Sequence, residues 1–315
     1  MNKRVVFCLM ASLTIFGCQV TEEHEFAPGV KAFTATMEPL ATDGAEAGTK
    51  TSLDNEGNVL WKQGDQVSIF AGSAINEHYR VSDASDGKTA ATLNKVESTG
   101  SVAGGEIPNN VAFYPYVSTA AIAKSGGSYV ISDISLPANQ NYAISSFGNG
   151  AFPMTAVTGS TNDFNLKFKN ALGGLKLQLK GNAIITSISV TGNNSEVLCG
   201  AAYVTVSDTA VPSIALTDMS STTITLDCGN GVQIGAETAT AFIIALPPMT
   251  MSGGFTVTVT DTENKRMEIK TTRSQTITRS NLLSMPSVDY VGVPAPVPEV
   301  AGSGESTPLE PNPGY

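Results

Sequence analysis

The stretch from Phe164 to Lys180 alternates apolar and polar residues with a period of two, but it changes phase once. A period of two is typical of a half-buried β-strand, whose successive side chains point to opposite faces. One strand cannot keep a single face inward through such a change, so we predict two strands with a break between Asn170 and Gly174. Gly173-Gly174 supplies the freedom for this break, at which the chain leaves one β-domain and begins a second. The apolar positions are even before the break and odd after it: Leu166, Phe168, Leu175, Leu177 and Leu179.

The composition also favours strands over helices. Only 15% of the 315 residues are charged, and glycine, serine and threonine are abundant, which suits short strands joined by turns. Turn signals recur about every ten residues in the first half, as in a β-sandwich. We therefore predict an all-β chain with an N-terminal β-sandwich over residues 31–160 and a C-terminal β-sandwich over residues 161–290.

The N-terminus has the features of an export signal. Lys3-Arg4 precedes an apolar run, Val5–Phe16, that is too short to span a bilayer. The run ends with a small residue before Cys18, which resembles a bacterial lipobox. We predict a signal peptide over residues 1–17, lipid on Cys18 and a lipidated tether over residues 18–30. Plain secretion with Cys18 unmodified is the alternative.

The charge of the chain excludes some partners. The formal net charge is −10, and loss of Lys3 and Arg4 with the signal peptide leaves 16 basic and 28 acidic residues, a net charge of −12. An acidic chain without a basic cluster is a poor partner for nucleic acid. It is equally unsuited to electrostatic binding on an anionic membrane, so the predicted membrane contact is through lipid.

Two cysteines, Cys199 and Cys228, remain in the exported part of the chain. The compartment is oxidising, so we predict a disulfide between them, with two buried thiols as the alternative. Such a bond closes a loop of about 30 residues and stabilises the fold by about 3 to 4 kcal/mol on the chain-entropy model.

The sequence offers no catalytic constellation. It has two histidines, and it lacks a nucleophile elbow, a metal-type Cys/His cluster and a Gly-rich dinucleotide loop. We therefore predict that the chain is not an enzyme and carries no metal or cofactor. Trp61, the only tryptophan, is interpreted as a core residue in preference to a sugar-binding platform.

Several short pieces of the chain, in their order along the sequence, match a known family: Lys50–Asp54, Val59–Phe70, Gly150–Met154, Leu166–Leu179, Leu198–Gly200, Phe242–Leu246, Gly253–Val259 and Ile277–Asn281. They resemble the fimbrillin-like (Mfa-like, type V pilus) lipoproteins of Bacteroides-type bacteria, over most of residues 31–290. The order of the pieces, more than any one of them, carries the resemblance.

The resemblance implies two tandem transthyretin-like antiparallel sandwiches and a structural or accessory (anchor or tip) subunit of a type V pilus-like fibre. In this family the first strand is cleaved off after a basic residue, and a neighbouring subunit's C-terminal strand fills the groove. Here the removable strand is Phe33–Met37, and the nearest basic residue after it is Lys50. The family usually cleaves after arginine, and no arginine lies between residues 5 and 79.

The resemblance also implies an outer membrane lipoprotein at the cell surface. The expected partners are other fimbrillin-like subunits, with host or bacterial glycans as possible adhesion targets. An acidic run after Cys18, Glu22 to Glu25, resembles a signal for display on the outer face, and a solvated tether is the alternative. Asp208-Thr-Ala210 matches the O-glycosylation pattern of such exported proteins with Thr209 as acceptor, and an ordinary loop is the alternative.

The C-terminal residues 291–315 are rich in proline, and we predict an extended or disordered tail there. A donor strand needs unbroken N–H groups, so only Ser287–Val293 suits that role. A surface lipoprotein without a fibre therefore remains open. The main alternative function is a carbohydrate-binding surface lipoprotein, and a β-sandwich hydrolase comes third. Carbohydrate binders usually expose several aromatic side chains, whereas aromatic residues make up 7% of this chain.

Overall fold

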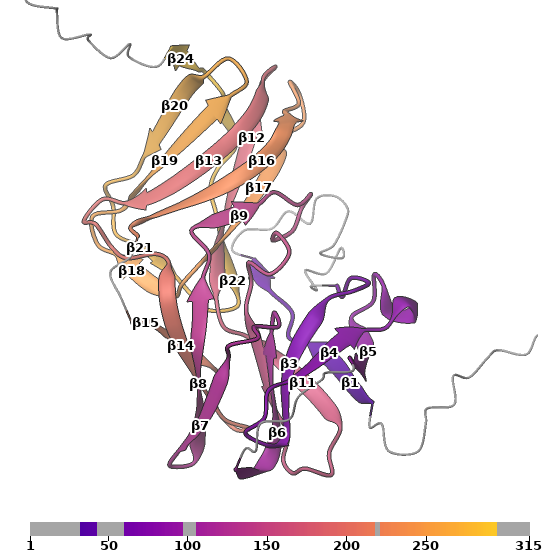
Figure 1. The fold of residues 1–315 in the computed structure, drawn as a ribbon. Helices are drawn as coiled ribbons and strands as arrows, with labels where there is room; N and C mark the ends of the chain where they lie inside the picture. The colour runs from indigo at the N-terminus through magenta and orange to yellow at the C-terminus, as the bar shows by residue number, and fades with distance from the viewer. Residues whose placement is uncertain (1–31, 43–59, 97–104, 218–220, 295–315) are drawn as a thin grey trace, which may run out of the picture. The chain divides into compact units, whose positions relative to one another are not determined.

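The structure is a computed structural model and describes residues 32–42, 60–96, 105–217 and 221–294. These residues form strands β1 to β24 and one short 3-10 helix, η1 (Asp83–Ser85), with no α-helix among them (Figure 1). The prediction of an all-β chain is confirmed. In this part of the chain, no helix has the length and apolar character that a membrane crossing requires.

Seven strands form a closed barrel in the order β1-β11-β10-β6-β3-β4-β5. The barrel closes because β1 pairs with β11 on one side and with β5 on the other. Leu166 and Phe168 of β11 face inward, and Lys167 faces out, as their alternation in the sequence predicts. The strands are β1 (Phe33–Met37), β3 (Gln66–Ser73), β4 (Glu77–Val81), β5 (Ala90–Lys95), β6 (Glu106–Tyr114), β10 (Met154–Val157) and β11 (Asn165–Asn170).

The core of the barrel is built around Trp61, whose side chain is fully buried. Its ring packs edge-on against Phe168 at 5.4 Å and against Tyr114 at 5.8 Å between ring centroids. Aromatic pairs in this arrangement stabilise a core beyond the area that they bury. The prediction of a core tryptophan is confirmed, and Trp61 cannot act as a sugar-binding platform.

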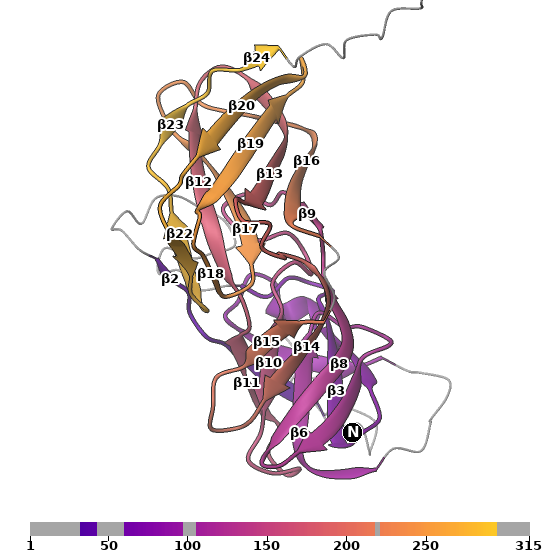
Figure 2. The same ribbon diagram turned by 90° about the vertical axis from the view of Figure 1, so that its left-hand side faces the viewer.

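The other described strands form four further sheets. The largest has the order β24-β20-β19-β13-β16-β9, and Figure 2 shows β19, β13 and β16 side by side within it. A second sheet has the order β17-β12-β22-β2, with β23 also paired to β12, and the two smaller sheets are β15-β14-β8-β7 and β18-β21.

Their bounds are β2 (Ala41–Thr42), β7 (Ala121–Ser125), β8 (Ser128–Leu136), β9 (Asn139–Asn141), β12 (Gly173–Lys180), β13 (Ile184–Gly192), β14 (Gly200–Val206), β15 (Ser213–Leu216) and β16 (Thr223–Gln233). The remaining strands are β17 (Thr240–Leu246), β18 (Met249–Met251), β19 (Phe255–Asp261), β20 (Lys265–Lys270), β21 (Gln275–Ile277), β22 (Asn281–Ser284), β23 (Val288–Asp289) and β24 (Val293–Pro294).

Strand pairing crosses the predicted domain boundary at residue 160 in both directions. β11 belongs to the barrel, and β14 pairs with β8, whereas β9 pairs with β16. The expected antiparallel pairing is also incomplete, because β1–β11, β16–β9, β12–β22, β12–β23 and β2–β22 run parallel. Parallel neighbours require long connections, and each of these pairs joins strands that are far apart in the sequence.

The predicted break in the phase of the alternation is confirmed between β11 and β12, which lie in different sheets. The reason given for the two glycines is wrong, however, because Gly173 and Gly174 lie inside β12 without left-handed backbone angles. A Cβ atom at Gly173 would overlap the carbonyl oxygen of Thr278, and one at Gly174 would lie 2.8 Å from Cδ2 of Leu282. The glycines therefore allow close packing against the chain around β21 and β22.

The C-terminal tail is extended where the structure describes it. Val293 and Pro294 form β24, which pairs with β20 at the edge of the largest sheet. An extended Val293–Pro294 is one of the two states predicted for the tail, and residues 295–315 lie outside the described residues. A proline is tolerated in β24 because an edge strand needs only some of its N–H groups for pairing.

Replacement of Gly173 by alanine tests this packing. We expect Gly173→Ala to lower the free energy of unfolding by about 1 to 3 kcal/mol, because its methyl group has no room beside the Thr278 carbonyl. Gly159→Ala is the matched control, since a Cβ atom there has no neighbour within 4 Å. Urea denaturation measures both, and equal stabilities of the two variants would contradict the packing explanation.

Candidate functional site

The candidate site is the place that the N-terminal segment of residues 32–42 occupies, here called the first-strand segment. Its first part is β1, which closes the barrel, and its second part is β2, which pairs with β22 in another sheet (Figure 1). One short segment therefore completes two sheets. The structure confirms the predicted first strand with its bounds, Phe33–Met37.

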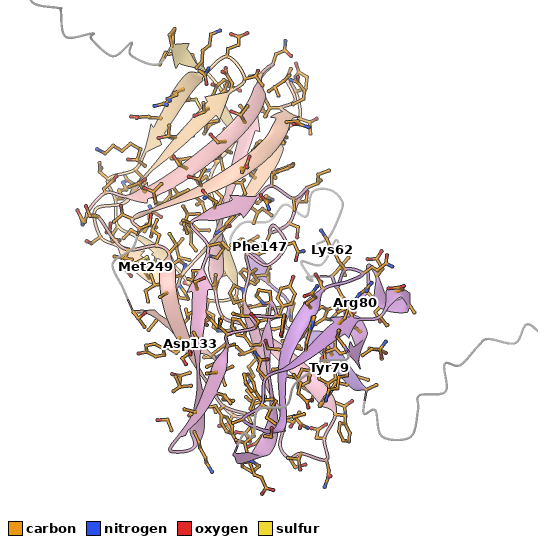
Figure 3. The ribbon with its side chains drawn as sticks, in the orientation of Figure 1. Lys62, Tyr79, Arg80, Asp133, Phe147 and Met249 are labelled. Carbon is orange, nitrogen blue, oxygen red and sulfur yellow. The ribbon has the colours of Figure 1, made fainter. Side chains whose placement is uncertain are left out.

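The slot for β1 recognises alternate side chains of the strand. Phe33 and Ala35 point into the core and are each 1% exposed, whereas Thr34 and Thr36 face out. The Phe33 ring meets the ring of Tyr79 on β4 edge-on, with 5.4 Å between centroids (Tyr79 is labelled in Figure 3). Burial of a phenylalanine side chain is worth about 1.5 to 3 kcal/mol, so Phe33 is the main apolar anchor of the segment.

Backbone pairing holds β1 on both sides. Thr34 and Glu38 donate their N–H groups to the carbonyl oxygens of Phe164 and Phe168, at 2.9 and 2.8 Å. On the other side, residues 33–36 pair in register with β5. Without β1, both β11 and β5 would present a row of unpaired N–H and C=O groups, which is the arrangement that accepts an added strand.

A charged cluster follows β1 directly. Glu38 receives two hydrogen bonds from the Arg279 guanidinium, from Nη1 to Oε2 at 2.5 Å and from Nη2 to Oε1 at 2.8 Å. The backbone N–H of Asn170 donates a third hydrogen bond to Glu38 Oε2 at 2.9 Å. A guanidinium that binds a carboxylate through two parallel bonds combines strength with a fixed geometry.

Ser280 and Asn170 connect this pair to the rest of the first-strand segment. The Ser280 hydroxyl donates to the carbonyl oxygen of Pro39 at 3.1 Å and accepts a hydrogen bond from Asn170 Nδ2 at 2.8 Å. Arg279 also donates to the carbonyl oxygen of Asn170 at 2.8 Å. We call Glu38, Asn170, Arg279 and Ser280 the Glu38 clamp. It joins the end of β11 to the start of β22 through the first-strand segment.

The clamp keeps Glu38 ionised. Burial alone raises the pKa of Glu38, but the hydrogen bonds from Arg279 and Asn170, with the charges of Arg279 and Lys169, outweigh it. The pKa of this carboxyl therefore lies below its ordinary value of 4.5. Because the folded-state pKa is depressed, the clamp stabilises the fold above pH 4.5, and this contribution is lost as pH falls through the folded-state pKa.

A small cavity lies beside the end of β1. Met37, Trp61, Asp65 and Tyr114 line it, and Phe147, labelled in Figure 3, also borders it. Tyr114 donates a hydrogen bond to Asp65 at 3.2 Å, and burial raises the pKa of Asp65 despite this bond and that from the Lys62 N–H. The cavity measures about 40 Å³, which is room for a water molecule or two but not for a substrate.

The described contacts of the site are strand pairing, apolar burial and one ion pair. Among the described residues, no group of three or more His, Cys, Asp and Glu side chains could hold a metal ion. His78, on β4, stacks on Tyr116 at 3.9 Å between centroids, and burial lowers its pKa. The slot of β1 offers two strand edges, on β11 and β5, for backbone pairing, and an apolar pocket for Phe33. The Glu38 clamp adds a guanidinium that binds a carboxylate.

Three of the residues singled out from the sequence lie apart from this site or outside the described residues. Thr209 lies in an exposed loop between β14 and β15, where Lys169 Nζ donates to the carbonyl oxygens of Asp208 and Ala210 at 3.2 and 2.8 Å. Cys18 and Lys50, with the signal peptide and the tether, lie outside the described residues. Their predicted roles stay predictions.

The predicted disulfide is not formed, because Cys199 and Cys228 are both thiols. Cys199 bridges to Ser221, and its Sγ lies 3.5 Å from the carbonyl oxygen of Thr223. Cys228 lies five residues beyond Thr223 on the same strand, a distance of about 16 Å. A disulfide requires Cα atoms within about 7 Å, so the two cysteines cannot meet.

Sequence reasoning missed the Glu38 clamp. Glu38 and Arg279 are 241 residues apart, and neither stands in a pattern that indicates a charge pair. Arg279 lies within one of the pieces that carry the family resemblance, Ile277–Asn281, but that match assigns it no role. The one local signal is an acidic residue directly after an alternating strand, which is too common to identify a partner.

Counting thiols in the cysteine variants tests the cysteine assignment. We expect Cys199→Ser and Cys228→Ser each to have one reactive thiol fewer than the wild type after denaturation. A disulfide predicts the opposite, because each variant would release a partner thiol. In the native chain we expect Cys228 to be unreactive, since burial, with a smaller effect of Asp227, raises its pKa to about 12.

The clamp predicts a pH-dependent loss of stability in Glu38→Gln. Both side chains are partly exposed, Arg279 by 19% and Glu38 by 29%, so we expect a loss of about 1 to 2 kcal/mol at neutral pH. The difference from the wild type should shrink as pH falls below 4.5, where Glu38 loses its charge.

Urea denaturation across this pH range measures the effect. Glu263→Gln is the control, since Glu263 is 67% exposed and pairs with Lys265 in an exposed bridge, so we expect little loss of stability and little pH dependence. A loss in Glu38→Gln that does not depend on pH would rule out the electrostatic explanation.

Comparison with known proteins gives matches among solved structures alone. No family model matches the chain, and no curated protein matches it. A candidate cell adhesion protein from Bacteroides ovatus aligns with a TM-score of 0.48 at 11% identity, covering 82% of this chain and 92% of that one. A candidate cell adhesion protein from Bacteroides uniformis aligns with a TM-score of 0.44 at 14% identity, covering 84% and 94%.

A third match is the tip fimbrial protein Mfa3 of Porphyromonas gingivalis. It aligns with a TM-score of 0.23 at 8% identity, covering 76% of this chain and 81% of the C-terminally truncated Mfa3. These three solved structures are thus described as cell adhesion or fimbrial proteins.

Proposed function

We propose that the chain is a fimbrillin-like subunit of a type V pilus-like surface fibre, brought to the outer membrane by lipid on Cys18. It serves as a structural, anchor or tip subunit and joins its neighbours by strand addition. The proposal keeps two transthyretin-like β-sandwich domains divided near residue 160, which exchange strands because β11 and β14 pair with strands before this boundary and β9 pairs with β16 after it. No catalytic chemistry enters the proposal, because the described residues form a binding slot.

The observation that supports the proposal is the position of β1. The strand nearest to the predicted anchor is also the strand that closes the barrel, and it pairs with β11 and β5 along its length. Its removal would open a slot with two unpaired edges and an empty apolar pocket at Phe33. A strand from another subunit can fill such a slot and gain both the hydrogen bonds and the apolar burial.

Two modifications complete the proposal. Cleavage after Lys50 would separate the first-strand segment and its lipid from the rest of the chain. Thr209 is proposed as an O-glycosylation acceptor, and its exposed loop leaves the hydroxyl accessible to an enzyme. The carbohydrate-binding alternative has less support, because Trp61, the tryptophan considered as a sugar-stacking residue, is buried in the barrel.

Sequencing the N-termini of surface protein by mass spectrometry tests the proposal in a Bacteroides host. We expect the wild-type chain to yield an N-terminus at Thr51 and Lys50→Ala to yield lipidated Cys18 alone. Lys31→Ala is the matched control, since cleavage at Lys31 would leave β1 in place. Recovery of nothing but lipidated Cys18 from wild-type cells would show that strand removal does not occur.

Immunogold electron microscopy of the same cells tests the fibre itself. We expect label along filaments in wild-type cells, and we expect Cys18→Ser to lower the amount of surface-bound protein because the anchor is lost. Label that is confined to the cell envelope, without filaments, would contradict the fibre and leave a surface lipoprotein.

A further inference from the structure

The first-strand segment fills a site with two parts, a strand slot and a carboxylate site. We infer that an incoming strand must carry an acidic residue directly after its last core side chain, a requirement that residues 285–315 of a second copy of this chain do not meet. The inference rests on the proposed strand exchange and specifies its partner.

The segment that is present defines what the slot accepts. The Phe33 position takes a large apolar side chain, and the Ala35 position, opposite Ala91 on β5, is 1% exposed and takes a small one. Met37 is the last apolar position, and Glu38 follows it at the clamp. In the direction of β1, the slot therefore accepts a strand with a large apolar residue at the Phe33 position, a small residue two positions later and an apolar residue two positions after that. An acidic residue must follow directly, at the Glu38 position, and the outward-facing positions between them are unrestricted.

A strand without an acidic residue at the Glu38 position binds more weakly because of the clamp. Without a carboxylate at the Glu38 position, the Arg279 guanidinium would lose two hydrogen bonds, and the Asn170 N–H would lose its acceptor. Arg279 is only 19% exposed and Asn170 is fully buried, so water cannot freely replace these bonds. A neutral strand fills the slot but leaves a partly buried cation without its counter-charge.

Other charges around the clamp favour the same partner. Lys169 adds a second positive charge that acts on the Glu38 position. These two cations stand in a chain whose formal net charge is −10. The clamp is thus a local cationic site on an acidic protein, and it favours an approaching carboxylate over a neutral or basic side chain.

The C-terminal residues of this chain do not fit the pattern. Within residues 285–315, an acid follows an aliphatic apolar residue at Val288-Asp289 and at Leu309-Glu310. With Val288 at the Met37 position, Pro286 would occupy the Ala35 position without the N–H group that a strand paired on both sides needs. With Leu309 there, Glu305 would carry its charge into the buried Phe33 pocket. Residues 285–315 of a second copy are therefore a poor donor strand.

A strand-exchange experiment on the full chain tests the inference. A specific protease site inserted after Lys50 allows the folded chain to be cut while the first-strand segment stays bound. Fluorescent peptides with the sequence of residues 31–42, unchanged or with Glu38→Gln, then compete for the slot, and anisotropy gives their affinities. We expect the Glu38→Gln peptide to bind about 5- to 30-fold more weakly, and a peptide of residues 303–315 not to compete.

Charge reversal separates the clamp from general packing. In the Arg279→Glu chain we expect the preference to invert, so that a Glu38→Arg peptide binds more tightly than the unchanged peptide. Arg273→Glu, at an exposed position outside the clamp, is the control and should leave the order of affinities as in the wild type. The peptide comparison on the wild-type chain needs no variant and decides the question if Arg279→Glu does not fold.

The outcomes distinguish this inference from the proposed function. Equal affinities of the unchanged and Glu38→Gln peptides would overturn the carboxylate requirement and leave strand exchange intact. Competition by the peptide of residues 303–315 would overturn the exclusion of these C-terminal residues as a donor strand. A cut chain that never exchanges its own segment for any peptide would overturn the proposed function itself.

Discussion

The pairing of β1 with both β11 and β5 is the constraint on which the rest of the barrel depends. A closed barrel has no edge, and this one is closed by a strand of five residues at the N-terminal end of the described chain. The barrel is therefore stable against edge-to-edge association only while β1 stays in place. A protein that uses strand addition needs this property, because the same strand must protect the slot and later leave it.

The Glu38 clamp adds a second constraint, which acts on one residue position of the bound strand and not on its whole length. Apolar burial at Phe33 and Ala35 stabilises any bound strand with suitable apolar side chains, whereas the bidentate bond to Arg279 stabilises only a strand with an acidic residue at the Glu38 position. Because Asn170 ends β11 and Ser280 precedes β22, the clamp also couples the barrel to the sheet that contains β12. Loss of the first-strand segment would therefore release β2 and β1 together.

Local structure could be predicted from the sequence where one face of a strand alternates cleanly. The bounds of β1 and the break between β11 and β12 follow from a period of two, which depends only on neighbouring residues. The pairing of β14 with β8 and the bond of Glu38 to Arg279 join residues far apart, and no local pattern encodes them. The disulfide prediction failed for the same reason, since Cys199 bridges to Ser221 ahead of β16 whereas Cys228 lies within β16, and no local pattern encodes either position.

Register links the two constraints. If a strand in the slot slips by one residue, its apolar side chains turn outward, because successive side chains of a strand face opposite sides. The same slip moves the acidic residue by about 3.3 Å, beyond the reach of two parallel bonds to Arg279. A slip of two residues restores the inward face, but it brings a large side chain to the small Ala35 position and moves the acid away from Arg279. The carboxylate therefore acts with the order of large and small side chains to fix the register, and this gives a charged residue at the end of the strand a role in specificity.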